Sequence, residues 1–498
     1  RPIDLIWLMP AEGEKMNPIL AYGLMFATLG FFGYVGYQSS IGKKLESDEY
    51  LSARGSQNWL RIGLSLFASG MGIWILFGPS EVGYWGGFWD VLGYAVSAST
   101  PFLLLAYVGP MIRNRLPDGV TLADYVRMKI GRPMQIYVGI ISVIYMFTFL
   151  FAEFTAIGKA MSVLSDMNPL IPMFAVGLVT TAYTAYGGLP ASLQTDRIQA
   201  WVVLWLIAVL LLILFGGDLS SLIADAKAYN PEGDLNWSIG SMSYMESFSS
   251  GLALVVAITA AEMFSQGNWQ RAWASENDDA LRKGSFLAAG LVFPLVFMMG
   301  VLGTVVAAQG TAADPSASFF ILLEETGTFF VAGFIVLGIA LVCSSVDTLQ
   351  NAITASISRD LSDGSMNLFN ARIVTILMIP LAIYLATGPT ILGFTFNAVS
   401  VFGIFLFADL LAAATVLPVF LTLWERIDSR ASIIGGLFGL LSVVIYGAYT
   451  SDLSTGLGYL LSPTNEFGLA NLSVFLSALI GSGIATFLCS EVLNFVDD

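Results

Sequence analysis

The chain contains no histidine, only two cysteines and few charged residues. The absence of histidine removes the commonest metal-binding side chain and the one that titrates near neutral pH. Cys343 and Cys489 both lie in apolar stretches, so the sequence excludes a disulfide framework. Charged residues make up 11% of the 498 residues, whereas a soluble domain carries about twice that share. The composition therefore excludes an ordinary soluble protein.

Chemical signatures of catalysis are missing as well. The sequence shows no nucleophile–base pair, no cluster of metal ligands and no phosphate-binding glycine motif. We therefore expect that the protein is not an enzyme, and that it uses no cofactor and no nucleic-acid partner.

Apolar residues dominate instead and make up 56% of the chain. They form repeated runs of about 20 residues, the length of a helix that crosses the hydrocarbon core of a bilayer. The sequence predicts an all-α membrane protein with thirteen transmembrane helices. These are expected at 18–38, 59–79, 84–112, 134–163, 168–187, 197–216, 248–267, 285–308, 328–358, 371–388, 390–423, 432–450 and 468–490.

The positions of the basic residues fit this number of helices. With alternate loops on opposite sides, all but four of the 21 lysines and arginines fall on one face. The exceptions are Arg1, Lys15, Lys159 and Lys227. Cytoplasmic loops carry an excess of Lys and Arg, so we expect the N-terminus outside and the C-terminus in the cytoplasm of a cell-membrane protein.

Two of the predicted helices contain interruptions. The first is "ASGMGIWILFGPSEVG" at 68–83, which is rich in glycine and contains a proline. The second is "AEMFSQGNWQR" at 261–271, where polar residues interrupt an apolar run. The breaks lie five helices apart, an odd offset that is typical of two repeats inserted in opposite directions. Glycine and proline are also common in membrane helices, which leaves ordinary packing as an alternative.

This offset divides the chain into five parts. We expect an outside N-terminus, one helix and a cytoplasmic loop at 1–58, followed by a first repeat of five helices at 59–216. An acidic outer loop at 217–247 leads to a second repeat at 248–430. Two further helices follow at 431–498.

Four stretches resemble motifs of the sodium:solute symporter family, and they occur in the family's order. They are "GGLPASLQTDRIQAWVV" at 187–203, "NWQRAWAS" at 268–275, "VCSSVDT" at 342–348 and "LPVFLTLWERI" at 417–427. The helix 59–79 differs from the sugar, proline and sialic-acid branches and resembles a bacterial branch without an assigned substrate. The resemblance implies the five-plus-five inverted-repeat fold of leucine-type transporters, with one extra helix before the repeats and two after them.

The resemblance also implies a sodium site. It assigns the ion to the carbonyls of Ala68, Met71 and Leu341 and to the hydroxyls of Ser344 and Ser345. A hard cation prefers several oxygen ligands, and the last three residues share one helix face at i, i+3 and i+4. Back-bonding of the serines to the preceding turn is the alternative.

A second sodium site is implied at Asp196, Ser344 and Asp347. A carboxylate at membrane depth is costly and normally marks an ion path or a paired partner. For Asp196, a salt bridge with Arg197 at the cytoplasmic edge is the alternative.

For the solute, we expect a site between the two breaks. The candidate lining residues are Trp74, Ile75, Phe77, Glu81, Ser265, Gln266, Trp269 and Asn397. Amides both donate and accept hydrogen bonds, which suits a neutral or zwitterionic solute such as an amino acid, urea or a sugar. Three further acids, Glu153, Glu262 and Asp409, are expected at membrane depth without a basic neighbour. Each is structural, faces a wet cavity, or binds a proton or a substrate cation.

The resulting hypothesis is sodium-driven import by alternating access, with the solute, Na+ and the lipid bilayer as partners and a monomer as the transporting unit. Two alternatives remain: a proton-coupled symporter that uses the same three acids, and a membrane solute-sensor module.

Overall fold

The structure is a computed structural model that describes residues 15–41, 46–216, 244–309, 314–324, 328–391, 394–395, 400–422, 424, 426–466 and 468–497. Three sequence predictions therefore fall outside the described residues in whole or in part. They concern the first 14 residues, most of the acidic loop 217–247, and Asn397.

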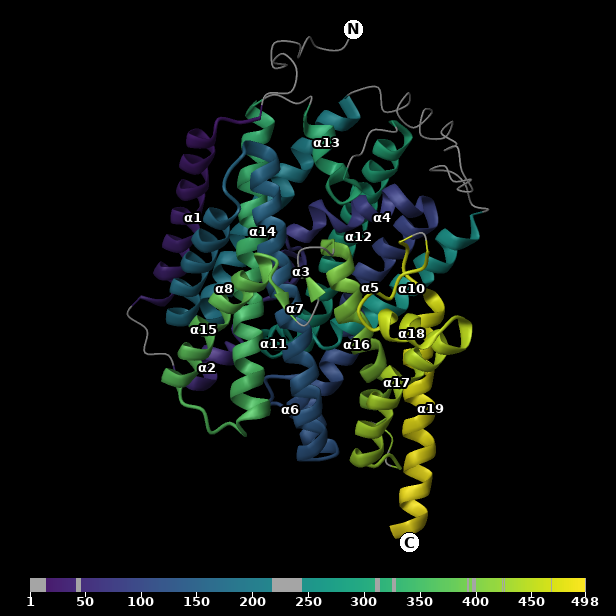
Figure 1. Cartoon of the computed structure of the whole chain (residues 1–498). Helices are drawn as coiled ribbons and strands as arrows, with labels where there is room; N and C mark the ends of the chain where they lie inside the picture. Colours follow the sequence, from purple (N-terminus) through teal and green to yellow (C-terminus); the bar gives the residue numbers. More distant parts are fainter. Residues whose placement is uncertain are drawn as a thin grey trace.

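The described chain forms a bundle of long helices (Figure 1). In chain order the helices are α1 (Pro18–Ser40), α2 (Ser47–Ser52), α3 (Trp59–Gly70), η2 (Ile73–Leu76), α4 (Gly78–Gly86), α5 (Phe88–Arg115), α6 (Leu122–Lys129), α7 (Arg132–Ser165), α8 (Leu170–Gly216), α10 (Met245–Glu262), α11 (Gln266–Ala274), α12 (Asp278–Gln309), η3 (Pro315–Ala317), α13 (Ser318–Glu324), α14 (Thr328–Ala355), η4 (Ser356–Leu361), α15 (Leu368–Ala386), α16 (Val401–Leu421), α17 (Ser429–Thr450), α18 (Leu453–Tyr459) and α19 (Leu472–Asp497). The predicted all-α class is confirmed.

Among the described residues, eleven helices are long and apolar enough to cross a membrane, or twelve if the bent pair α3 and η2–α4 is one span. The figure of thirteen stays a prediction. Two predicted helices, 168–187 and 197–216, form the single element α8, which is interrupted at Gly188. Gly188 has a φ of 58°, and a Cβ there would overlap with Tyr50. Only glycine takes this conformation at low cost.

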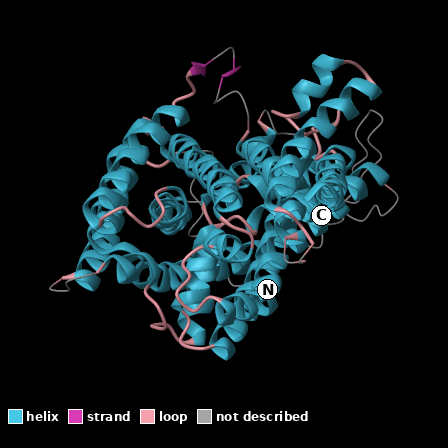
Figure 2. Ribbon diagram, turned by 90° about the horizontal axis from the view of Figure 1, so that it is seen from below, coloured by secondary structure: helices cyan, strands magenta, loops and turns pink. Residues whose placement is uncertain are grey.

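The sequence prediction was wrong at the start of the helix 390–423. Residues Thr390–Ile391 and Phe394–Thr395 form a small antiparallel hairpin, β1 and β2, at the edge of the bundle (Figure 2). Helix α16 begins only at Val401, where the Ser400 side chain accepts a hydrogen bond from the Gly403 amide. The prediction started the helix too early because it relied on apolar character alone. The capping serine sets where the backbone becomes helical.

Both predicted breaks are present. Helix α3 ends at Gly70, and the chain continues through η2 and α4 at an angle of 58°. Helix α10 ends at Glu262 and α11 begins at Gln266. Freed backbone groups at such breaks need partners from other elements, because no water is available in the membrane core.

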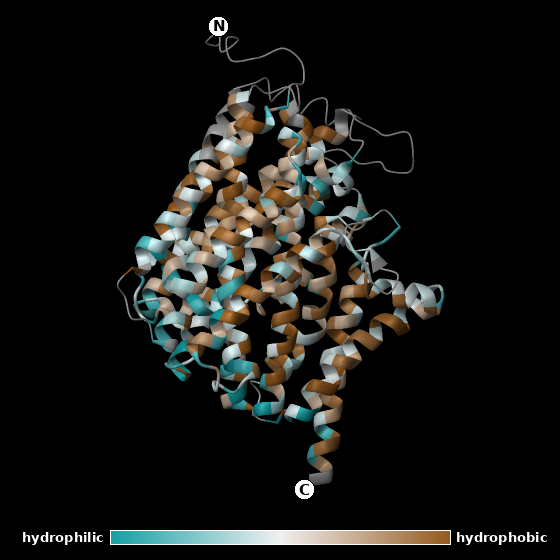
Figure 3. Ribbon diagram, turned by 60° about the vertical axis from the view of Figure 1, so that its left-hand side comes forward, coloured by the Kyte–Doolittle hydropathy of each residue, from teal (hydrophilic) through white to brown (hydrophobic). Residues whose placement is uncertain are grey.

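The packing of the bundle places both breaks inside the protein. Helix α12 packs against α3, α4 and α5, while α14 packs against α7 and α8. Apolar residues cover the middle of the bundle, and hydrophilic residues gather at its lower end (Figure 3). The C-terminal pair α17 and α19 packs on α16. The two breaks therefore lie among long helices that hold them in place.

Candidate functional site

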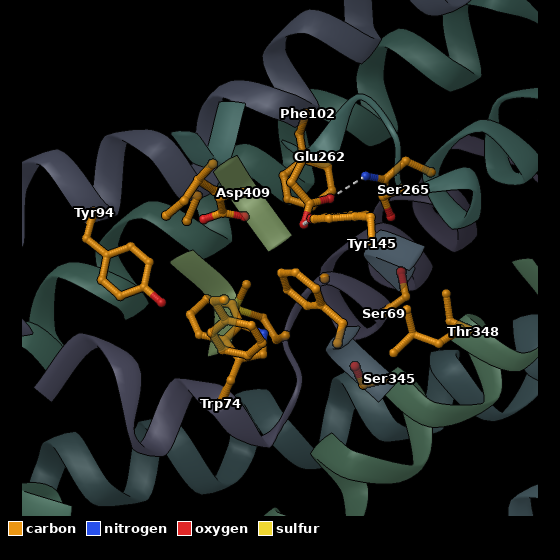
Figure 4. A pocket seen from close by; sticks show the side chains of 18 of the residues that line it. Ser69, Trp74, Tyr94, Phe102, Tyr145, Glu262, Ser265, Ser345, Thr348 and Asp409 are labelled. Atoms are coloured by element: carbon orange, nitrogen blue, oxygen red, sulfur yellow. Dashed lines mark hydrogen bonds between the residues drawn. The ribbon is translucent and has the colours of Figure 1, made fainter. Parts of the chain in front are cut away.

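A cavity joins the two breaks (Figure 4). Its described lining comes from the end of α3 and η2, from α5, α7, α10, α14 and α16, and from the second break. The lining residues are Ser69, Gly70, Met71, Trp74, Tyr94, Ala98, Phe102, Tyr145, Phe149, Ile258, Glu262, Ser265, Asn268, Ser345, Thr348, Leu349, Phe402, Phe405 and Asp409. One space therefore touches both interrupted helices and the serine-rich helix α14.

Two residues of the expected first sodium site line this cavity, Met71 and Ser345. The other three, Ala68, Leu341 and Ser344, are buried beside it. Helix α3 packs on α14, and Ala68 lies in the last turn of α3. Carbonyls in a last helical turn lose their intrahelical partners. Met71, directly after α3, and Ser345 of α14 thus line one space.

Glu153 of α7 supports the first break. It is buried, and its Oε2 accepts a hydrogen bond of 3.0 Å from the amide of Ile73, the first residue of η2. A carboxylate from another helix thus satisfies a backbone donor that the break exposes. Of the three alternatives for Glu153, this contact supports the structural one.

Gly72 makes room for that carboxylate. A Cβ at Gly72 would overlap with the side chain of Glu153. We expect Gly72→Ala to push Glu153 away from Ile73 and to destabilise the protein by about 1–3 kcal/mol, the usual cost of overpacking. Thermal unfolding in detergent measures this change. Gly290→Ala in α12 is the matched control, because none of the described residues outside the backbone of its own helix comes within 4 Å of its added Cβ; an equal loss there would contradict the assignment.

Asp196 lies in a fully buried cluster with Arg271. The arginine Nη2 lies 2.6 Å from Asp196 Oδ2, and both side chains are 0% exposed. Hydroxyls of Ser65 and Ser344 also donate to Asp196, each at 2.6 Å. The alternative of a pair with Arg197 is wrong, because the partner comes from α11 instead. A motif places residues along the chain but does not show which helices meet.

In the described part of the chain, the hydrogen bonds that Asp347 accepts come from hydroxyls. Tyr183, Ser192 and Thr195 donate to it at 2.6, 2.7 and 3.0 Å, and Thr348 lies at 3.4 Å. Thr348 also accepts from Arg271 at 2.8 Å, which links this carboxylate to the neighbouring cluster. Arg271 thus contacts Asp196 directly and is linked to Asp347 through Thr348.

Of the expected solute-lining residues, Trp74 and Ser265 line the cavity. The other described ones lie elsewhere. Gln266 bridges the Leu122 amide and the Ser142 hydroxyl, and Trp269 donates to the carbonyl of Met263. Ile75, Phe77 and Glu81 are buried in η2 and at the start of α4. Polar side chains in a helix break satisfy freed backbone groups in some cases and bind a solute in others. Polarity alone therefore does not identify the residues that bind the solute.

Sequence reasoning missed most of the cavity wall, which is aromatic. The rings of Tyr145, Phe149, Phe405, Trp74, Tyr94 and Phe402 follow one another with centroids 4.4 to 6.0 Å apart. They come from α5, α7, η2 and α16. Aromatic residues are frequent throughout this chain, at 13%, so no local signal distinguishes these six.

A charged pair lies beside the ring of Phe77, which is not among the residues that line the cavity. Lys159 Nζ lies 2.7 Å from Asp314 Oδ2 and 5.9 Å from the centre of the Phe77 ring. Burial alone raises the pKa of the Asp314 carboxyl, but hydrogen bonds from Lys159 and Ser316 outweigh it and hold the pKa below its usual range. This contact connects α7 to the segment before α13.

A helical bundle whose two broken helices meet at a central cavity defines a membrane transporter. The chain superposes on a solved structure of a Na+-coupled sialic acid symporter with a TM-score of 0.72 at 15% identity, over 95% of this chain and 98% of that one. The solved structure of MHP1, a nucleobase-cation-symport-1 family transporter in a closed conformation, gives a TM-score of 0.50 at 13% identity, over 89% and 96% of the two chains. These likenesses show the fold.

Sequence comparison supplies the family. Residues 50–439 match the sodium:solute symporter family. The chain is also 30% identical over 453 residues to the spermidine transporter DUR31 of Candida albicans, which covers 88% of this chain and 81% of that protein. The chain belongs to the sodium:solute symporter family, and the resemblance seen in its motifs is confirmed.

Proposed function

We propose that this symporter imports a small organic solute together with sodium by alternating access. The observation that carries the proposal is the cavity itself, which touches the end of α3, the break after α10 and Ser345 of α14. A solute and an ion that bind in one space between interrupted helices are coupled, because one closing movement of the helices encloses both. A membrane potential supplies about 2.3 kcal/mol per charge per 100 mV, and a tenfold sodium gradient adds about 1.4 kcal/mol.

The proposed sodium ligands are the carbonyls of Ala68, Met71 and Leu341 with the hydroxyls of Ser344 and Ser345. Ser344 already donates its proton to Asp196, so the lone pairs of its oxygen stay available to a cation. Neutral ligands bind sodium weakly enough to release it into the cytoplasm, where the ion is dilute. We keep Asp196, Ser344 and Asp347 as the proposal for a second ion, because Arg271 compensates Asp196 and a further cation would balance the charge of Asp347.

The substrate class follows from the cavity and from a relative. A neutral or zwitterionic solute was expected from the amides at the second break. The cavity contains two carboxylates, Glu262 and Asp409, and the relative from Candida albicans is named for spermidine, a polyamine. We therefore include amines among the candidate solutes, beside amino acids.

Proton coupling is a second candidate, favoured by one observation. Asp409 is buried, and its Oδ1 has no hydrogen-bond partner among the described residues. In that position the protonated carboxylic acid costs less free energy to bury than the ionised carboxylate.

Uptake by the purified protein in liposomes distinguishes sodium coupling from proton coupling. An inward sodium gradient at equal pH should drive accumulation, and a pH gradient without sodium should not. Uptake that follows the pH gradient alone would replace sodium by the proton as the coupling ion.

Asp347→Asn tests the second ion. If Asp347 and Asp196 hold it, we expect the sodium Hill coefficient of uptake to fall from near two towards one. The asparagine oxygen accepts from one of the hydroxyls of Tyr183 and Ser192, and the other hydroxyl rotates to accept from the new amide group, so the local fold should persist. A coefficient that stays unchanged while the melting temperature drops would assign Asp347 a structural role only.

A further inference from the structure

The two carboxylates of the cavity lack the usual compensation for buried charge. Asp409 is buried and Glu262 is half-buried, and no basic residue is among the described residues that line the cavity. Neither forms an ion pair within 4 Å in the described part of the chain, whereas Asp196 does. Buried acids are normally paired, bound to a cation or protonated. The pair therefore calls for a cation or for protons.

The geometry of each acid differs. Glu262 accepts hydrogen bonds from Tyr145 at 3.2 Å and from Asn268 at 2.9 Å, so both of its oxygens have donors. Asp409 lines the same cavity with its Oδ1 unpartnered. In Figure 4 the two acids lie on one side of the cavity and Trp74 on the other. Asp409 thus brings to the cavity wall a carboxylate with one acceptor that has no donor among the described residues.

The walls around these acids also favour positive charge. Six aromatic rings follow one another around the cavity, and ring faces attract ammonium groups within about 6 Å. Helix α10 ends at Glu262 and α3 ends at Gly70, which both line the cavity. The C-terminal end of a helix carries partial negative charge. The N-terminal ends of α11 and α16 also reach the cavity, through Asn268 and Phe402, and offset these two ends, so the attraction for a cation comes from the carboxylates and the rings.

We propose that the cavity binds an alkyldiamine, with one ammonium group at Glu262, the other at Asp409 and the hydrocarbon part against the aromatic rings. This inference rests on the proposed function and names its substrate class. Two carboxylates match two ammonium groups, so a diamine should bind more tightly than a monoamine of the same length. Sugars offer Asp409 hydroxyl donors but no positive charge, and carboxylates without an amine repel it, so neither class compensates the two acids.

Binding is tested with the purified full-length protein in detergent. We expect 1,4-diaminobutane and spermidine to raise the melting temperature in sodium buffer, butylamine to raise it less, and glucose and acetate to leave it unchanged. Asp409→Asn and Glu262→Gln should each weaken diamine binding about 30-fold or more, because each removes one partner of a buried charge pair. Asp90→Asn is the matched control, a buried aspartate on α5 that accepts from Ser250 outside the cavity.

The outcomes separate this inference from the proposed function. Sodium-driven uptake of a neutral solute, with no amine binding, would overturn the inference and keep the function. Amine binding without sodium stimulation would keep the inference and overturn the function. Equal binding of amines to wild type and to Asp409→Asn would also overturn the inference. If a variant fails to fold, competition between tetramethylammonium and radiolabelled diaminobutane on the wild type decides, since only a cation site gives displacement.

Discussion

Replacing Ser345 by alanine should raise the sodium concentration for half-maximal uptake about tenfold. The hydroxyl of Ser345 lines the cavity beside the end of α3, and alanine leaves the ion with one oxygen ligand fewer. A bond from a hydroxyl to a charged group contributes about 1.5 kcal/mol or more, which corresponds to about tenfold in affinity. The helix should persist because alanine is the best helix former. Uptake into liposomes at a series of sodium concentrations measures the change.

Ser285→Ala is the matched control for this variant. Ser285 is also a fully buried serine in a long helix, and its hydroxyl has no partner among the described residues. Its sodium dependence should equal that of the wild type. An unchanged sodium dependence in Ser345→Ala would remove Ser345 from the site.

Replacing Arg271 by methionine should destabilise the protein by about 3–5 kcal/mol, the usual cost of removing one partner of a buried ion pair. The guanidinium contacts Asp196, Ser65, Thr348 and the carbonyl of Gly267 at 2.6 to 2.9 Å. Without it, Asp196 keeps a buried charge with hydroxyl donors alone. Thermal unfolding and the yield of monodisperse protein in detergent measure the loss.

Two further variants test whether loss of the buried ion pair causes the destabilisation of Arg271→Met. Arg271→Met combined with Asp196→Asn should recover part of the stability, because no unpaired charge remains. Arg430→Met removes the partner of Asp428 in a largely exposed pair, where the arginine side chain is 55% exposed, and should change stability by less than about 1 kcal/mol. Similar losses in Arg271→Met and Arg430→Met would show that burial of the pair does not matter.

Several features could be predicted from local sequence. The apolar runs gave the all-α membrane class, since a run of about 20 apolar residues fits a bilayer only as a helix. Glycine and proline at 68–83 gave the first break, because Gly70 and Gly72 weaken a helix wherever it lies. The serine-rich stretch around Ser345 was found by its motif. Each of these signals is contained in neighbouring residues.

Other features depend on residues that are far apart along the chain. Asp196 and Arg271 come from different helices, and so do Glu262 and Asp409. The aromatic wall is assembled from four elements with no shared spacing. Gln266 and Trp269 have the polar character expected of a solute site, yet their partners are backbone and side-chain atoms of the protein.

The sequence by itself determined the all-α membrane class, the two interruptions and the family, because bilayer thickness and backbone hydrogen bonding act on contiguous residues. Only the tertiary structure decided which buried acid has a counter-ion. Packing of α11 against α14 and α3 brings Arg271 to Asp196, while Asp409 on α16 faces a cavity without a basic residue among its described lining. The charge at a buried site is set by the groups within a few ångströms, and those distances exist only once the helices have packed.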